Sequence, residues 1–189
     1  MSHKLNKQDI FDFFRDKSFI EDLDEDTFLI EETKNEEKEK NPLRYLIITS
    51  FNQNSKYWVL DTESSAFQLQ GNKVEKILLE ETQEGILNII MIEMKSTNVK
   101  PEKIKNKFKN SLSFVYILLH LLEGKSNQNI NIFGILVAQK EMNWHHRENL
   151  NIFSSTSIRY TKRSFYTEAS HLSIAFEDLI KSPPIRHKK

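Results

Sequence analysis

The chain contains no cysteine, and it has only four glycines and four prolines among its 189 residues. Without cysteine, the protein has no disulfide bonds and no thiolate chemistry. No apolar stretch is long enough to span a bilayer, and the N-terminal residues lack the apolar segment of a secretory signal peptide. We therefore expect a cytoplasmic protein that acts without a membrane partner.

The motifs of several enzyme classes are missing as well. The sequence has no glycine-rich phosphate-binding loop and no Gly-x-Ser-x-Gly elbow of a serine hydrolase. His145 and His146 are adjacent, so they point in different directions in a strand or a helix and make a poor zinc pair. His120 lies in an apolar segment, which is more typical of a hydrogen-bonded core residue than of a metal ligand.

Charge is balanced overall but unevenly distributed. The 27 basic residues equal the 27 acidic ones, which gives a formal net charge of zero at pH 7. Residues 21–40 carry ten acids and three lysines, whereas residues 95–109 carry six lysines and one acid. The acidic block is typical of a solvated surface with an exposed loop at 33–42, and it is also a candidate partner surface. The basic segment can form a phosphate-binding stripe even in a neutral chain.

The length favours a single domain, which we place at residues 1–180, followed by a basic tail at 181–189. The hydrophobic pattern predicts, in order, a short helix at 8–16, a helix or strand within 19–32, strands at 43–51, 56–61, 66–70, 73–81 and 86–95, a helix at 102–122, a strand at 130–138, a polar loop or short irregular helix at 139–151, an edge strand at 157–166 and a last strand or helix at 172–180. Short turns predict an antiparallel meander over residues 43–95. The long helix before 130–138 predicts a parallel crossover.

The apolar strand at 86–95 ends in the tripeptide Glu93-Met94-Lys95. Because side chains alternate along a strand, Glu93 and Lys95 share one face and Met94 points to the other. Burying either charge alone is costly, so these residues must be paired, exposed at a sheet edge or used in chemistry. Glu-x-Lys by itself is typical of a surface ion pair. The apolar strands and the long helix around it are what favour a functional site.

Residues 73–138 place a strand, a turn, a strand ending in Glu-x-Lys, a lysine-rich helix and another apolar strand in succession. This order resembles the core of the PD-(D/E)xK, or restriction-endonuclease-like, nuclease superfamily. The resemblance implies an α/β fold in which a mixed β-sheet, an antiparallel meander plus a parallel crossover strand, is flanked by helices. It also implies a Mg²⁺- or Mn²⁺-dependent endonuclease that acts on DNA, with RNA as the less favoured substrate. Analogy with small nucleases of this type suggests a role in defence against foreign DNA.

The resemblance assigns roles to three residues. In the family, an acid on the first strand of a hairpin and the acid of the (D/E)xK motif hold the metal ion, while the lysine orients or activates the attacking water. Here these positions correspond to Glu75, Glu93 and Lys95. Magnesium prefers oxygen ligands and keeps several waters, so two carboxylates and a phosphate oxygen can complete its site.

The second acid is the part of the pattern that departs from the family. No Pro-Asp dipeptide is present, and Glu75 stands where the family usually has Asp. Asp61 is therefore a competing metal ligand, and Glu80 or Glu81 are weaker ones. A carboxylate from the N-terminal region, such as Glu31 or Glu32, could also join, but the sequence does not select one.

On the helix that follows, Lys103, Lys107 and Ser111 recur at every fourth residue and share one face. We expect these residues and Lys100 to contact nucleic-acid phosphates. An ordinary solvated helix face is the alternative.

A second hypothesis assigns the same fold to the chain but no nuclease activity. The chain would then be a catalytically inactive binding or assembly subunit, with Glu93 and Lys95 as a simple ion pair. The acidic block at 21–40 would face a protein partner, or the chain would form a homodimer.

Overall fold

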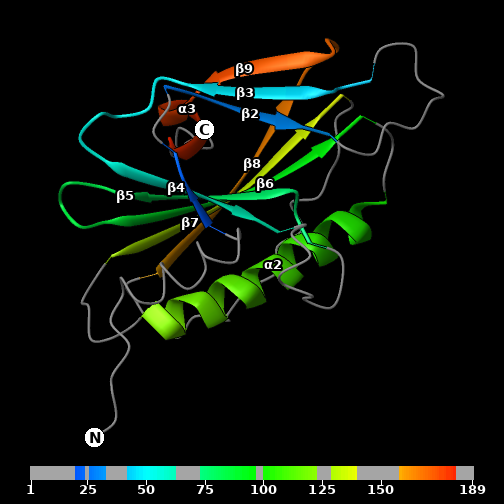
Figure 1. Cartoon of the computed structure of the whole chain (residues 1–189). Coiled ribbons are helices and arrows are strands. Elements are labelled where there is room, and N and C mark those ends of the chain that lie inside the picture. Colours follow the sequence, from blue (N-terminus) through cyan, green and yellow to red (C-terminus); the bar gives the residue numbers. More distant parts are fainter. Residues whose placement is uncertain are drawn as a thin grey trace, which may run out of the picture.

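The computed structural model describes residues 20–23, 26–32, 42–62, 73–96, 100–122, 129–139 and 158–181. In chain order their elements are β1 (Ile20–Asp22), β2 (Thr27–Glu31), β3 (Tyr45–Thr49), β4 (Lys56–Asp61), β5 (Lys76–Glu81), β6 (Leu87–Lys95), α2 (Pro101–Leu122), β7 (Ile130–Ala138), β8 (Ile158–Tyr166), β9 (His171–Ala175) and α3 (Phe176–Ile180) (Figure 1). The predicted helix at 8–16 and the strand at 66–70 lie outside the described residues, as do nearly all of the loops at 33–42 and 139–151 and of the tail at 181–189.

The described part of the chain is built in three layers (Figure 1). The middle layer is a six-stranded sheet in the order β1-β4-β5-β6-β7-β8, in which the pairs from β1 to β6 are antiparallel and the pairs from β6 to β8 are parallel. α2 covers one face of this sheet, and the three-stranded sheet β2-β3-β9 covers the other together with α3. The fold is therefore α/β with mixed sheets, as the sequence predicts.

Strand β6 is buried along its whole length because it lies between two covering layers. Its side chains alternate between them, so that Met91 packs in the core beneath α2 and Ile92 packs in the core beneath the three-stranded sheet. Glu93 and Lys95 follow Met91 by two and four residues, so their side chains lie on the same face of the strand as Met91, which is the face that α2 covers.

The connections around β6 agree with the sequence. The turn between β5 and β6 is closed by the amide of Gly85, which donates to the carbonyl oxygen of Thr82 over 2.9 Å. Gly85 has a φ of 76°, in the left-handed region that favours glycine. α2 connects β6 to β7, and these strands run parallel, as a crossover requires. Neither described helix is long and apolar enough to cross a membrane.

The predicted meander over residues 43–95 is wrong in its first part. Residues 52–55 form a turn, but β3 and β4 on either side of it belong to different sheets, and β3 pairs with β2 and β9. Phe51, Tyr57 and Phe176 pack against one another at this corner, with ring centroids 4.9 to 5.2 Å apart. This aromatic packing stabilises a change of sheet where the short turn alone indicated a hairpin.

Two segments that the sequence left open are assigned by the structure. Residues 19–32 contain the strands β1 and β2 rather than a helix. Residues 172–180 contain both of the predicted alternatives, because β9 leads directly into α3. β8 lies at the edge of the larger sheet, as predicted.

Candidate functional site

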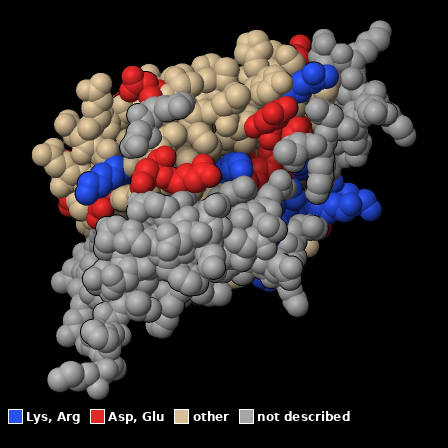
Figure 2. Space-filling view, in the orientation of Figure 1, with Lys and Arg blue, Asp and Glu red and all other residues tan. Residues whose placement is uncertain are grey.

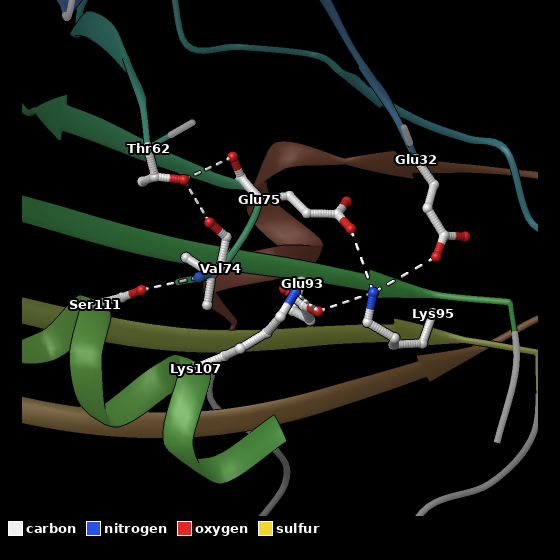
Figure 3. A network of polar contacts seen from close by, with 8 residues as sticks. All are labelled: Glu32, Thr62, Val74, Glu75, Glu93, Lys95, Lys107 and Ser111. Carbon is white, nitrogen blue, oxygen red and sulfur yellow. Dashed lines mark hydrogen bonds and ion pairs between the residues drawn. The ribbon is translucent and has the colours of Figure 1, made fainter. Parts of the chain in front are cut away.

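Charged side chains at the end of β6 gather around one ammonium group (Figure 3). Lys95 Nζ lies 3.0 Å from Glu93 Oε1 and 3.5 Å from both Glu75 Oε1 and Glu32 Oε1. Lys107, from α2, reaches the same Glu93 oxygen at 2.5 Å. These five residues, which we call the glutamate cluster, come from four separate segments of the chain. The predicted trio of Glu75, Glu93 and Lys95 is thus brought together.

The glutamate cluster is buried and carries more acids than bases. Glu93 is 0% exposed, Glu32 3%, Glu75 7% and Lys95 9%. Three carboxylates face two ammonium groups, and an uncompensated charge in such an environment is costly. The cluster therefore favours either a bound proton or a further cation.

Each carboxylate of the cluster also keeps one oxygen without a partner. No described residue hydrogen-bonds Glu32 Oε2, Glu75 Oε2 or Glu93 Oε2, although all three atoms are buried. Buried polar atoms in native proteins are nearly always paired, so three unpaired oxygens in one cluster need an explanation.

Burial and neighbouring charges shift the pKa values of Glu75, Glu32 and Lys95. Burial, and then the neighbouring Glu93 carboxylate, raises the pKa of Glu75 to about 8. Burial likewise raises the pKa of Glu32. Burial opposes the charged form of Lys95, but the carboxylates of Glu93 and Glu75 outweigh it and raise the pKa of this ammonium group. These shifts favour the charged form of Lys95 and the protonated form of Glu75.

A break in strand regularity just before β5 carries Glu75. Val74 packs in the same core as Ile77, three residues later, which strict alternation along a strand does not allow. The chain therefore bends between them, and Glu75 lies at this bend. Irregularities of this kind often re-aim a side chain next to a functional site.

Two buried hydroxyl groups hold the bend (Figure 3). Thr62 Oγ1 donates a shared hydrogen bond to the carbonyl oxygens of Val74 and Glu75, and the Val74 amide donates to Ser111 Oγ over 2.9 Å. Ser111 was expected to contact phosphate. Its hydroxyl is buried and already bonded, which does not fit that prediction, and its contact instead supports the segment that presents Glu75.

Glu32 is the residue that sequence reasoning could not select. Ile30 is buried in β2, and side chains alternate beyond it, so Glu31 is exposed and Glu32 is buried. The Glu32 amide continues the pairing with the β3 side of the sheet by donating to the carbonyl oxygen of Arg44 over 2.8 Å. Alternation counted from Ile30 is the sequence signal that could have identified it.

The competing acids do not replace Glu75 in the described cluster. Asp61 ends β4 opposite Lys76, and its side chain lies outside the described residues. Glu80 lies at the other end of β5, where it accepts hydrogen bonds from Tyr57 Oη (2.9 Å) and Asn88 Nδ2 (2.7 Å).

The lysines of α2 differ in their accessibility. Lys100 and Lys103 are exposed, whereas Lys107 is half-buried against Glu93. In the orientation of Figure 1, Lys and Arg side chains gather in Figure 2 beside the end at which α2 begins, next to acidic side chains. In this view the basic side chains adjoin carboxylates, and Lys100 and Lys103 are exposed at the start of α2.

The residues of the glutamate cluster match the oxygen chemistry of a hard divalent cation. Each of the three carboxylates contributes one buried oxygen that nothing in the described part of the chain pairs. Their present arrangement surrounds the Lys95 ammonium, and the described residues contain no ready-formed group of three metal-ligating side chains. The donor set thus fits a magnesium or manganese ion, provided that one lysine ammonium group moves away from the carboxylate oxygens when it binds.

No protein-family model, no curated protein and no solved structure matches this chain. The functional proposal therefore depends on the geometry of the glutamate cluster.

Proposed function

We propose that the protein is a metal-dependent phosphodiesterase of the PD-(D/E)xK type that cleaves DNA, with Glu32, Glu75, Glu93 and Lys95 as its active site. The observation that supports this most directly is the convergence of one acid before β5 with an acid and a lysine at the end of β6. All three carboxylates lie within 3.5 Å of one ammonium nitrogen. The succession of β5, β6, α2 and β7, antiparallel and then parallel, agrees with a restriction-endonuclease-like core.

In this proposal the three glutamates bind the metal ion, and Lys95 interacts with the phosphate. Glu75 and Glu93 would hold Mg²⁺ or Mn²⁺, with Glu32 as a third oxygen donor. When bound, such an ion polarises a phosphoryl oxygen and lowers the pKa of a coordinated water. Lys95 stays protonated among the carboxylates, so it acts as a hydrogen-bond donor and a positive charge beside the phosphate rather than as a base. Lys100 and Lys103 would contact the DNA backbone. A role in defence against foreign DNA is an analogy with small nucleases.

The test is cleavage of plasmid DNA by the purified full-length chain with Mg²⁺ or Mn²⁺ and with EDTA. The wild type is compared with Glu93→Gln, Lys95→Ala and the control Glu84→Gln, which changes an exposed acid on the turn between β5 and β6. We expect both cluster variants to lose about 100-fold or more in rate, because each removes a charge at the reacting phosphate. The control should keep the wild-type rate. Cleavage that persists in EDTA or survives Lys95→Ala contradicts the proposal.

A second candidate, a binding or assembly subunit without catalysis, is favoured by a different observation. The lysines already contact all three carboxylates, as they would in a purely structural ion-pair network. Exposed acids on β1 and β2, such as Glu21 and Glu31, would then contribute to a partner surface. A wild type that neither cleaves DNA nor binds Mn²⁺ would support this candidate.

A further inference from the structure

Glu93 Oε1 is shared by two ammonium groups that reach it from different elements. Lys95 lies two residues further along β6, and its Nζ is 3.0 Å away. Lys107 lies on α2, and its Nζ is 2.5 Å away. Figure 3 shows Lys107 extending from the helix toward Glu93, while Lys95 approaches from the strand.

Lys95 and Lys107 differ in the number of carboxylates that they contact and in the exposure of their side chains. Lys95 contacts three carboxylates, and its side chain is 11% exposed. Within the described residues, Lys107 is paired with Glu93 alone, and its side chain is 23% exposed. A lysine stem is flexible, so moving Lys107 breaks one contact, whereas moving Lys95 breaks three.

Charge balance also distinguishes the two lysines. Carboxylates bind a metal ion in their ionised form, and three ionised carboxylates with both ammonium groups in place leave one negative charge in excess. A divalent cation added to this arrangement would leave one positive charge in excess, and it would lie beside Lys107 on the same Glu93 oxygen. Three carboxylates are balanced by Lys95 together with one divalent cation, which is the least costly charge state for a buried cluster.

Once released from Glu93, the Lys107 ammonium group can turn toward the exposed start of α2. Lys103 lies one turn before Lys107 on the same face of α2, and it is exposed. The first turns of α2 also carry exposed Lys100. Lys107 turned toward these residues would extend the exposed basic row by one turn toward the cluster.

We propose that Lys107 is the displaceable cation of the glutamate cluster. A divalent metal ion at Glu93 takes its place, and the released ammonium group turns toward Lys103 to become an additional phosphate contact. This inference rests on the proposed function and deepens it, because metal binding and DNA binding then strengthen each other. Such coupling is reciprocal, so DNA would raise the affinity for the metal by the same factor.

The displacement can be read directly from the reactivity of Lys107. The full-length chain is treated with an amine-acetylating reagent with and without Mg²⁺, and the modified lysines are quantified by peptide mass spectrometry. We expect acetylation of Lys107 to rise about tenfold with Mg²⁺, while that of Lys103, already exposed, stays constant. Unchanged acetylation of Lys107 at a Mg²⁺ concentration that saturates the site would overturn the inference.

Calorimetric titration with Mn²⁺ separates this failure from failure of the proposed function. Lys107→Met should bind Mn²⁺ about tenfold more tightly than the wild type, because no internal cation has to leave, whereas the matched control Lys103→Met should differ by less than about threefold. Equal affinity of Lys107→Met and the wild type would overturn the inference and leave the metal site intact. Absence of Mn²⁺ binding in all three proteins would overturn the inference together with the proposed function.

Discussion

Two buried clusters lie at opposite ends of β5 and β6, and both are built around glutamate. The glutamate cluster contains Glu75 and Glu93 at one end. At the other end, Glu80 accepts hydrogen bonds from Tyr57 Oη and Asn88 Nδ2, and Asn88 Oδ1 accepts one from Asn131 Nδ2 over 2.9 Å. We call this second group the amide cluster.

The clusters differ in how completely they are paired. In the amide cluster both oxygens of Glu80 accept a hydrogen bond, and burial together with Glu80 raises the pKa of Tyr57 to about 12, so the phenol remains a donor. In the glutamate cluster, three carboxylate oxygens have no hydrogen-bond partner among the described residues. A fully paired network stabilises the fold, whereas buried acids with unpaired oxygens are more typical of a site that binds a ligand.

The largest expected effect on stability is in the amide cluster. Glu80→Ala leaves the Tyr57 hydroxyl and the Asn88 amide buried without an acceptor, so we expect the free energy of unfolding to fall by about 3 kcal/mol. Urea denaturation measures this change, with the exposed Glu84→Ala as the control expected to shift stability by less than about 0.5 kcal/mol. A cost below about 1 kcal/mol would show that the amide cluster does not stabilise the fold as its hydrogen bonds imply.

Glu75→Gln should have a smaller effect that depends on pH. Burial in the folded protein raises the pKa of Glu75 from its ordinary value of 4.5 to about 8, so between these values the folded state binds a proton that the unfolded chain has released. The stabilisation from this group is therefore complete at acidic pH and is lost as the pH rises toward 8. We expect wild-type stability to fall by more than about 1 kcal/mol across this range in the absence of divalent ions, and Glu75→Gln to flatten the dependence.

Thermal or urea denaturation at a series of pH values provides the measurement. Glu84→Gln, at an exposed position, should keep the wild-type slope. A Glu75→Gln profile parallel to that of the wild type would mean that this carboxyl is ionised in the folded state throughout the range.

Ser111→Ala is expected to have the smallest effect on stability and to act on the glutamate cluster through Glu75. It removes one hydrogen bond from the Val74 amide, which should cost about 1 kcal/mol. Because the bend then holds Glu75 less firmly, the affinity for Mn²⁺ should fall by about tenfold.

The matched control for this variant is Ser113→Ala on the same helix. Ser113 is exposed, and its hydroxyl donates to the carbonyl oxygen of Lys109 within the helix. Calorimetry measures the Mn²⁺ affinity of both variants, and urea denaturation measures their free energy of unfolding. Together they distinguish an effect on the position of Glu75 from a loss of stability. An equal loss of Mn²⁺ affinity in the two variants would contradict the positioning role of Ser111.

The local sequence pattern was sufficient to predict the arrangement of the elements nearest to β6. The alternation of side chains placed Glu93 and Lys95 on one face, and the length of the helix before β7 required a parallel crossover. Both follow from chain geometry over a few residues, so neither depends on what packs against the strand. The turn at residues 52–55 was equally local, yet it did not determine pairing, because β3 pairs with the distant strand β9 and with β2 instead of β4.

By itself, the sequence determined that an acid and a lysine share one face at the end of a buried strand, and the family resemblance offered Glu75 as their partner, with Asp61 as the competing acid. The tertiary structure decided which distant groups complete the site. Glu32 comes from the second sheet, Lys107 enters from α2, and Ser111 is turned inward to hold the bend before Glu75. These contacts depend on how layers pack across tens of residues of sequence, whereas the pairing of Glu93 with Lys95 requires only the two-residue period of a strand.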